Sequence, residues 1–103
     1  MTDFDYQQID DLIHSRIRLA VIAALHTMGS ASFSMIKKSV GATDGNLSVH
    51  MRKLEDAGYL EVEKSFVERK PVSIYSLTTS GKAALKAYIL YLENMLPLKG
   101  TGD

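Results

Sequence analysis

The residues between Thr43 and Gly58 combine a regular apolar spacing with polar and cationic side chains that suit contact with a nucleic acid. Leu47, Met51 and Leu54 are spaced so that they share one face of a helix. The opposite face carries Asn46, Ser48, Val49, Arg52 and Lys53. A helix that enters the major groove needs short side chains in its first turns and phosphate-neutralising cations later. Because spacing alone reports only amphipathicity, the stretch predicts either such a DNA-reading helix or an ordinary surface helix.

A second, shorter helix is expected just before this one. Ser34 is a suitable N-cap for a helix over Met35–Val40, and Gly41 then ends that helix in a tight turn. Thr43 or Asp44 is expected to cap the longer helix, and Gly58 to end it in a left-handed conformation. A short helix, a glycine-containing turn and a longer helix form the sequence pattern of a helix-turn-helix.

The helical pair needs a core to hold it. The pattern predicts a buried central helix over Ser15–Met28, preceded by a short helix over Tyr6–Ile13. The segment Ser30–Phe33 is expected to be a short connection.

After Gly58 the apolar period changes from that of a helix to that of a strand. Alternation over Tyr59–Val67 and β-branched residues over Val72–Leu77 predict a β-hairpin, with Pro71 in the loop or at the first position of the second strand. A last helix, capped by Thr78 or Thr79, is expected to run to about Leu96.

The composition favours a single domain over residues 1–103. The formal net charge is zero, which argues against nucleic-acid binding when the whole chain is summed. The distribution matters more, because a neutral protein can still present one positive face. The cations expected on that face include Lys37, Lys38 and Arg69, and the positions of Glu55 and Asp56 decide how strong its field is.

Several functional classes are excluded or disfavoured by what the sequence lacks. There are no cysteines, which rules out disulfides, thiolate metal sites and a cysteine nucleophile, and fits a reducing, cytoplasmic location. No apolar run reaches membrane-spanning length. His14, His26 and His50 lack metal-ligand spacing, and His50 is expected to pack beside the apolar stripe. No catalytic motif is present, so the sequence predicts neither an enzyme nor a cofactor or metal site.

The order of elements resembles the winged helix-turn-helix transcriptional regulators of the MarR and ArsR type, and most closely their small single-domain group. The matching blocks are IHSRIRLA at Ile13–Ala20, TDGNLSVHMRKLEDAGY at Thr43–Tyr59, RKP at Arg69–Pro71 and YSLTTSGKAAL at Tyr75–Leu85. The resemblance implies an α+β, mostly helical fold with a two-stranded β-hairpin wing and terminal dimerisation helices. Without cysteine ligands, a thiolate metal sensor of the ArsR kind is excluded.

The resemblance also implies a homodimer that regulates transcription from double-stranded DNA, with the recognition helix in the major groove and the wing on the backbone or minor groove. The residues expected to contact DNA are Ser34, Lys37, Lys38, Thr43, Asn46, Ser48, Val49, Arg52, Lys53, Arg69 and Lys70. The C-terminal helix, about residues 79–96, has more apolar residues than one core-facing stripe needs, and its excess predicts a self-association surface. The residues expected at that dimer interface are Phe4, Ile9, Leu12, Tyr88, Ile89, Leu92, Met95 and Leu96.

Two alternatives stay open from the sequence. A winged helix can also serve as a protein-interaction adaptor that does not bind DNA, although such an adaptor has no need for clustered cations. A small-molecule effector is compatible with the resemblance, but the residues identify none.

Overall fold

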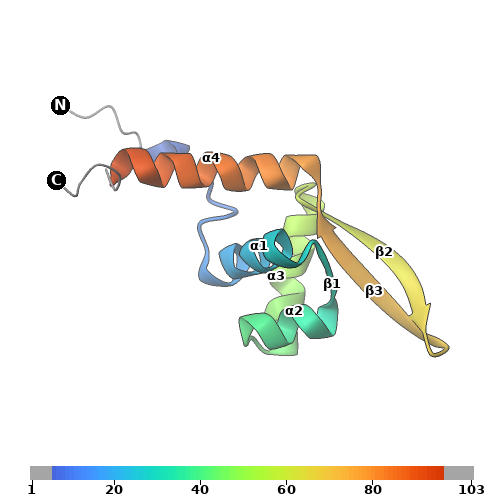
Figure 1. Cartoon of the computed structure of the whole chain (residues 1–103). Helices are drawn as coiled ribbons and strands as arrows, with labels where there is room; N and C mark the ends of the chain where they lie inside the picture. Colours follow the sequence, from blue (N-terminus) through green and yellow to red (C-terminus); the bar gives the residue numbers. More distant parts are fainter. Residues whose placement is uncertain (1–5, 97–103) are drawn as a thin grey trace.

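The computed structural model describes residues 6–96, which form a helical core, a small antiparallel sheet and a long C-terminal helix (Figure 1). The elements in chain order are a 3-10 helix at Tyr6–Gln8, α1 at Arg16–Met28, β1 at Ser30–Ser32, α2 at Phe33–Val40, α3 at Asp44–Asp56, β2 at Leu60–Val67, β3 at Lys70–Leu77 and α4 at Thr79–Met95. The α+β, mostly helical winged fold expected from the sequence is confirmed. The expected single domain over 1–103 stays a prediction.

One buried apolar cluster joins the helices to the sheet. The α1 helix is its centre, with Val21, Ile22 and Leu25 buried, and α2 adds Ile36. Because the apolar residues of α1 repeat at helical spacing, one face of the helix is buried, while Ala23 and His26 on the other side are exposed. The buried central helix predicted over Ser15–Met28 is confirmed, with Ser15 as its N-cap.

The segment expected to be a plain connection contains a strand. Residues Ser30–Ser32 form β1, which pairs antiparallel with β3 so that Ala31 lies opposite Tyr75. The sheet therefore has three strands, in the order β1-β3-β2, instead of the two of a simple hairpin. A three-residue strand is too short to show alternation in the sequence, and its partner lies far along the chain.

Two other details near α2 and in β3 differ from expectation. Ser32, rather than Ser34, caps α2 by accepting a hydrogen bond from the Met35 backbone N–H at 3.2 Å. Pro71 is the second residue of β3, not a loop or first-strand residue. The strand tolerates proline there because β1 pairs only with residues 74–76, which leaves that edge of β3 without a neighbouring strand.

The short helix predicted over Tyr6–Ile13 is wrong in extent. Only Tyr6–Gln8 is helical, as a single 3-10 turn. The Asp10 side chain accepts a hydrogen bond from the Leu12 backbone N–H at 2.9 Å. Such local side-chain bonds compete with the helix and favour a turn.

The α4 helix begins at a tightly packed junction with the end of α3. Thr78 caps it, accepting from the Gly81 N–H at 3.0 Å and donating to the Gly58 carbonyl at 2.5 Å. Gly81 is buried, and a Cβ at this position would overlap the Tyr59 carbonyl oxygen. Glycine at 81 is therefore what allows α4 to approach the start of β2 so closely.

Candidate nucleic-acid interface

The α3 helix is fixed in orientation by its apolar side. Leu47, Met51 and Leu54 are buried in the common core. Of the two capping candidates, Thr43 is the N-cap, and its Oγ1 accepts from the Asn46 N–H at 3.3 Å. Gly58 follows the helix with a φ of 83°, and the Tyr59 N–H reaches back to the Leu54 carbonyl at 3.0 Å, so both predicted helix ends are confirmed.

The outward side of α3 carries the side chains that the sequence assigns to DNA contact. Asn46, Ser48, Val49, Arg52 and Lys53 are all exposed. Within residues 6–96, none of their side chains takes part in a hydrogen bond or an ion pair. They are therefore available to an external partner, and the core would not have to rearrange to meet one.

His50 lies on the inner flank of α3, as expected from the sequence. Its Nδ1 lies 2.8 Å from an Arg18 guanidinium nitrogen, and Arg18 also donates to the Leu12 carbonyl at 2.5 Å. Arg18 can only donate, so the His50 ring accepts the bond in its neutral form. Burial, and then the nearby charges of Arg18 and Lys53, lower the pKa of His50. This link between α1, the N-terminal segment and α3 has no signal in the sequence, because its partners are far apart in the chain.

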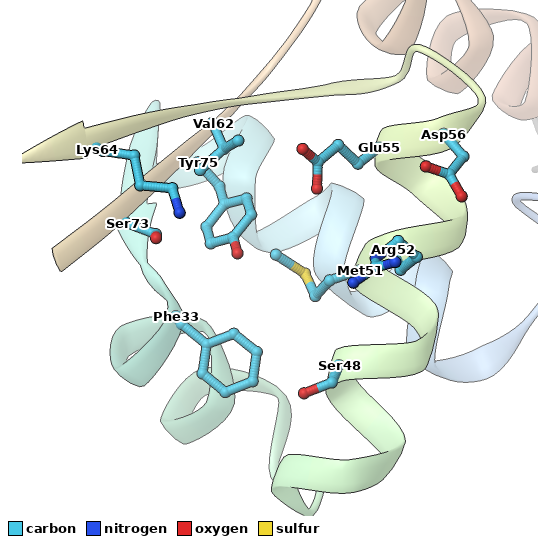
Figure 2. Close-up of a pocket in the computed structure, with 10 residues that line it drawn as sticks. All are labelled: Phe33, Ser48, Met51, Arg52, Glu55, Asp56, Val62, Lys64, Ser73 and Tyr75. Carbon is cyan, nitrogen blue, oxygen red and sulfur yellow. The ribbon is translucent and has the colours of Figure 1, made fainter.

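A groove of about 530 Å³ separates α3 from the hairpin, which we call the wing (β2, β3 and their turn, residues 60–77). Its lining combines Arg52, Glu55 and Asp56 of α3 with Lys64 of β2 and Tyr75 of β3 (Figure 2). Figure 2 shows the Glu55 side chain projecting from α3 into this groove. Burial, and then the charge of Glu55, raise the pKa of Tyr75.

The lining of the groove shows where the carboxylates of Glu55 and Asp56 lie relative to the cations of α3, which the sequence alone did not determine. Glu55 and Asp56 lie at the C-terminal end of α3, away from Asn46 and Ser48 in its first turns. Glu55 projects from α3 towards the wing, whereas Asp56 lies on the side of α3 away from Lys64 (Figure 2). Their negative charges reduce the positive field of this part of the surface. Negative charge therefore lies between Arg52 of α3 and Lys64 of the wing, in the groove that Ser48 also lines.

The last turn of α2 adds further cations. Lys38 is exposed, and Lys37 forms an ion pair with Asp44, with 3.1 Å between Nζ and Oδ1. Both partners are substantially exposed, so the pair contributes little stability and Lys37 can exchange the carboxylate for another anion. Ser34 is exposed in the first turn of α2, on the helix that precedes α3.

The wing ends in a two-residue turn formed by residues with unusual backbone angles. Val67 pairs with Lys70, and the intervening Glu68 and Arg69 have φ values of 52° and 70°. Positive φ at both central residues is the signature of a type I′ turn, which matches the twist of the strands. Arg69 and Lys70 are exposed at this tip, away from the core.

The residues expected at a dimer interface fall into two groups. Tyr88 is only 7% exposed and its hydroxyl lies 2.9 Å from His14 Nδ1, so it packs within its own chain. Ile9, Leu12 and Leu92 are partly buried against the same core. Ile89, Leu90 and Met95 are exposed on α4, and Leu96, which follows the helix, is exposed as well. Phe4 lies outside the described residues.

Comparison with known proteins places this geometry in a family. The family model that describes the winged helix DNA-binding domain matches residues 17–96. The chain belongs to this family. A curated relative, an uncharacterised protein of Methanocaldococcus jannaschii, is 33% identical over 78 residues, covering 76% of this chain and 85% of the relative.

Solved structures share the winged fold. The transcriptional regulator homologue from Pyrococcus horikoshii is similar with a TM-score of 0.82 and 26% identity, covering 89% of this chain and 93% of that one. A MarR mutant from Escherichia coli, complexed with operator DNA, has a TM-score of 0.67 and 18% identity, covering 89% of this chain and 71% of that one. The second likeness bears on the fold alone.

The described part of the chain offers no grouping of histidine, aspartate or glutamate side chains that could hold a metal ion. Among the same residues, no helix has the length and hydropathy needed to cross a membrane.

Proposed function

We propose that this winged helix protein is a sequence-specific regulator of transcription that binds double-stranded DNA as a homodimer and acts in the cytoplasm. The observation that carries the proposal is the unoccupied outward side of α3, where Asn46, Ser48 and Val49 precede Arg52 and Lys53. Family membership supports DNA binding, and the Escherichia coli MarR mutant, which shares the fold, is complexed with operator DNA.

In this proposal α3 enters the major groove and its first turns read base edges. Asn46 can pair bidentately with adenine, and the Val49 methyl groups can meet a thymine methyl. Arg52 and Lys53 approach phosphates, which fix the register without reading sequence. Phosphate contacts also come from the helix before α3, from the N-cap of α3 and from the wing. The residues that make them are Ser34, Lys37, Lys38, Thr43, Arg69 and Lys70.

The direct test is fluorescence anisotropy with the protein and a duplex from its own upstream region. The control duplex has the same composition in shuffled order, at the same salt concentration. Specific regulators prefer their site by on the order of a thousandfold or more, and we expect a preference of this kind. No binding to either duplex would contradict the proposal and favour the adaptor function.

The dimer that we propose is built on the exposed side of α4. Ile89 and Leu90 are 45% and 50% exposed, and together they form an apolar patch that Lys86 and Glu93 flank. These residues share one face of the helix. At a rise of 1.5 Å per residue, Lys86 and Glu93 lie about 5 Å on either side of the point midway between Ile89 and Leu90.

That spacing is self-complementary. If two copies of α4 pack antiparallel across a two-fold axis at this midpoint, each Lys86 meets the Glu93 of the partner subunit. A dimer of this kind doubles the DNA contacts and presents two recognition helices to half-sites about 34–36 Å apart.

Charge reversal tests the dimer and its register together. Lys86→Glu or Glu93→Lys alone should weaken self-association at least about tenfold, because both symmetric pairs become repulsive. An equimolar mixture of the two variants should restore dimers as heterodimers, because every pair is again of opposite charge. Analytical ultracentrifugation measures both results. A wild-type monomer at micromolar concentration would contradict the dimer, and dimers indifferent to both reversals would contradict this interface.

A further inference from the structure

The wing carries a large apolar side chain that its own fold does not bury. Phe66 is 72% exposed, the largest exposed fraction among the described large apolar residues. Its cross-strand neighbour Pro71 is also exposed, and so is the adjacent Val67. The outer half of the wing therefore presents an aromatic ring that contributes little to the core.

The position of Phe66 relates it to the α3 side of the wing. Side chains alternate between the two faces of a strand, so Phe66 shares a face with Val62 and Lys64. Those two residues line the groove opposite α3 (Figure 2). Along the chain Phe66 lies between Lys64, on the same face of β2, and the turn tip formed by Glu68, Arg69 and Lys70. Lys70 pairs with Val67, so it starts β3 on the other face of the wing.

An apolar ring between cations fits a partner with anionic walls and an apolar interior. The minor groove of DNA has this chemistry, because phosphates border it while sugars and base edges form its floor. Minor-groove proteins insert apolar side chains, phenylalanine among them, between cationic anchors of this sort. A purely apolar protein partner would leave Lys64, Arg69 and Lys70 with no complementary charge.

We propose that Phe66 inserts into the minor groove beside the segment read by α3, while Arg69 and Lys70 hold the bordering phosphates. The inference rests on the proposed DNA-binding function and adds an apolar contact to a wing otherwise expected to act through charge. It predicts that part of the wing's contribution to affinity is insensitive to salt.

The chain has no tryptophan, so a Phe66→Trp variant carries a single indole probe at the site. In a saturating complex with the upstream duplex, its fluorescence should become several-fold less accessible to acrylamide quenching. Val67→Trp is the matched control, since Val67 is the adjacent residue on the opposite face of the strand. Its accessibility should change much less.

Affinity and footprinting complete the test. Phe66→Ala should weaken binding about tenfold and leave the slope of log affinity against log salt unchanged, because no phosphate contact is lost. Hydroxyl-radical footprinting should lose protection of the minor-groove sugars under the wing, and protection under α3 should remain. Since Phe66 is exposed, the variant should keep the wild-type circular dichroism and melting temperature.

The outcomes separate this inference from the proposed function. If the wild-type protein binds the duplex but the indole of the Phe66→Trp variant stays as accessible as before, the inference fails and DNA binding stands. Protection of that indole that appears without DNA as protein concentration rises would assign the ring to contact between copies and overturn the inference. If the wild-type protein binds no duplex, both proposals fail.

Discussion

The α3 helix and the outer half of the wing are held in place by different means. Three buried side chains anchor α3 to the core, and its two ends are closed by Thr43 and Gly58. In β2, by contrast, every residue from Glu63 to Val67 is exposed. The wing tip is held by the strand ladder and by its turn, without a packed core beneath it.

This difference suits the two parts to different tasks. Reading a base edge requires side chains placed within hydrogen-bonding distance, which a helix packed rigidly on a core can provide. Contact with phosphates tolerates more freedom, because it depends mainly on charge and carries no sequence information directly. We therefore expect changes under α3 to affect folding, and most changes in the outer wing to affect only binding.

The largest expected effect comes from removing an anchor of α3. Leu47 is fully buried at 0% exposure, so Leu47→Ala should lower the free energy of unfolding by about 2–5 kcal/mol. Val67→Ala in the outer wing is the control and should change it by less than about 0.5 kcal/mol. Urea denaturation followed by circular dichroism measures both. Equal losses in the two variants would mean that the wing is as firmly packed as α3.

The next effect concerns the junction where α3 leads into the wing and α4. Gly81→Ala should cost about 1–3 kcal/mol or more, because its Cβ would overlap a rigid backbone carbonyl. Gly45→Ala, in the first turn of α3, is the matched control because a Cβ there meets nothing within 4 Å. That variant should gain up to about 1 kcal/mol from helix propensity. A Gly81→Ala protein as stable as wild type would show that the junction is not tightly packed.

A smaller effect is expected at the wing turn, where stability rests on backbone conformation. Asparagine tolerates the left-handed region better than glutamate, so Glu68→Asn should stabilise the protein by about 0.5–1 kcal/mol. The melting temperature should rise by a few degrees, while Glu63→Asn, within the exposed part of β2, should give no such rise. A lower melting temperature for Glu68→Asn would show that the turn is not of the type I′ kind.

The smallest effect is the pH dependence of the contact between α1 and α3. The pKa of His50 is lower in the folded protein than its ordinary value of 6.5, so the unfolded chain binds the proton more readily. The stability that depends on neutral His50 is present above about pH 6.5 and is lost as the pH falls below it. We expect unfolding free energies at about pH 7.5 and 5.5 to differ more for wild type than for His50→Gln. The glutamine side chain can still accept from Arg18 but does not titrate, so identical pH profiles would contradict this role for His50.

Much of the fold could be predicted because its signals are local. The apolar spacing of Leu47, Met51 and Leu54, together with Thr43 and Gly58 at the ends, was enough to delimit α3. Alternation over Tyr59–Val67 and β-branched residues over Val72–Leu77 predicted the two strands of the wing for a similar reason.

The missed features depend on partners distant in the sequence. The β1 strand exists because residues 74–76 offer it a free edge, and three residues cannot reveal that pairing. The Arg18–His50 contact and the close approach of Gly81 to Tyr59 likewise arise only when the helices are packed. From the sequence, Tyr88 was one of the apolar residues of the C-terminal helix expected at a dimer interface. In the structure it is buried within its own chain, where the N-terminal segment brings His14 against it.

The most direct test of the account compares Asn46→Ala with Arg69→Ala on cognate and shuffled duplexes over a range of salt concentrations. We predict that Asn46→Ala loses about 1–3 kcal/mol on the cognate duplex alone and leaves the salt slope unchanged. Arg69→Ala should weaken binding to both duplexes alike and reduce the slope by about 1. If instead Asn46→Ala weakened both duplexes equally while Arg69→Ala removed the preference for the cognate sequence, the division of tasks between α3 and the wing would be wrong.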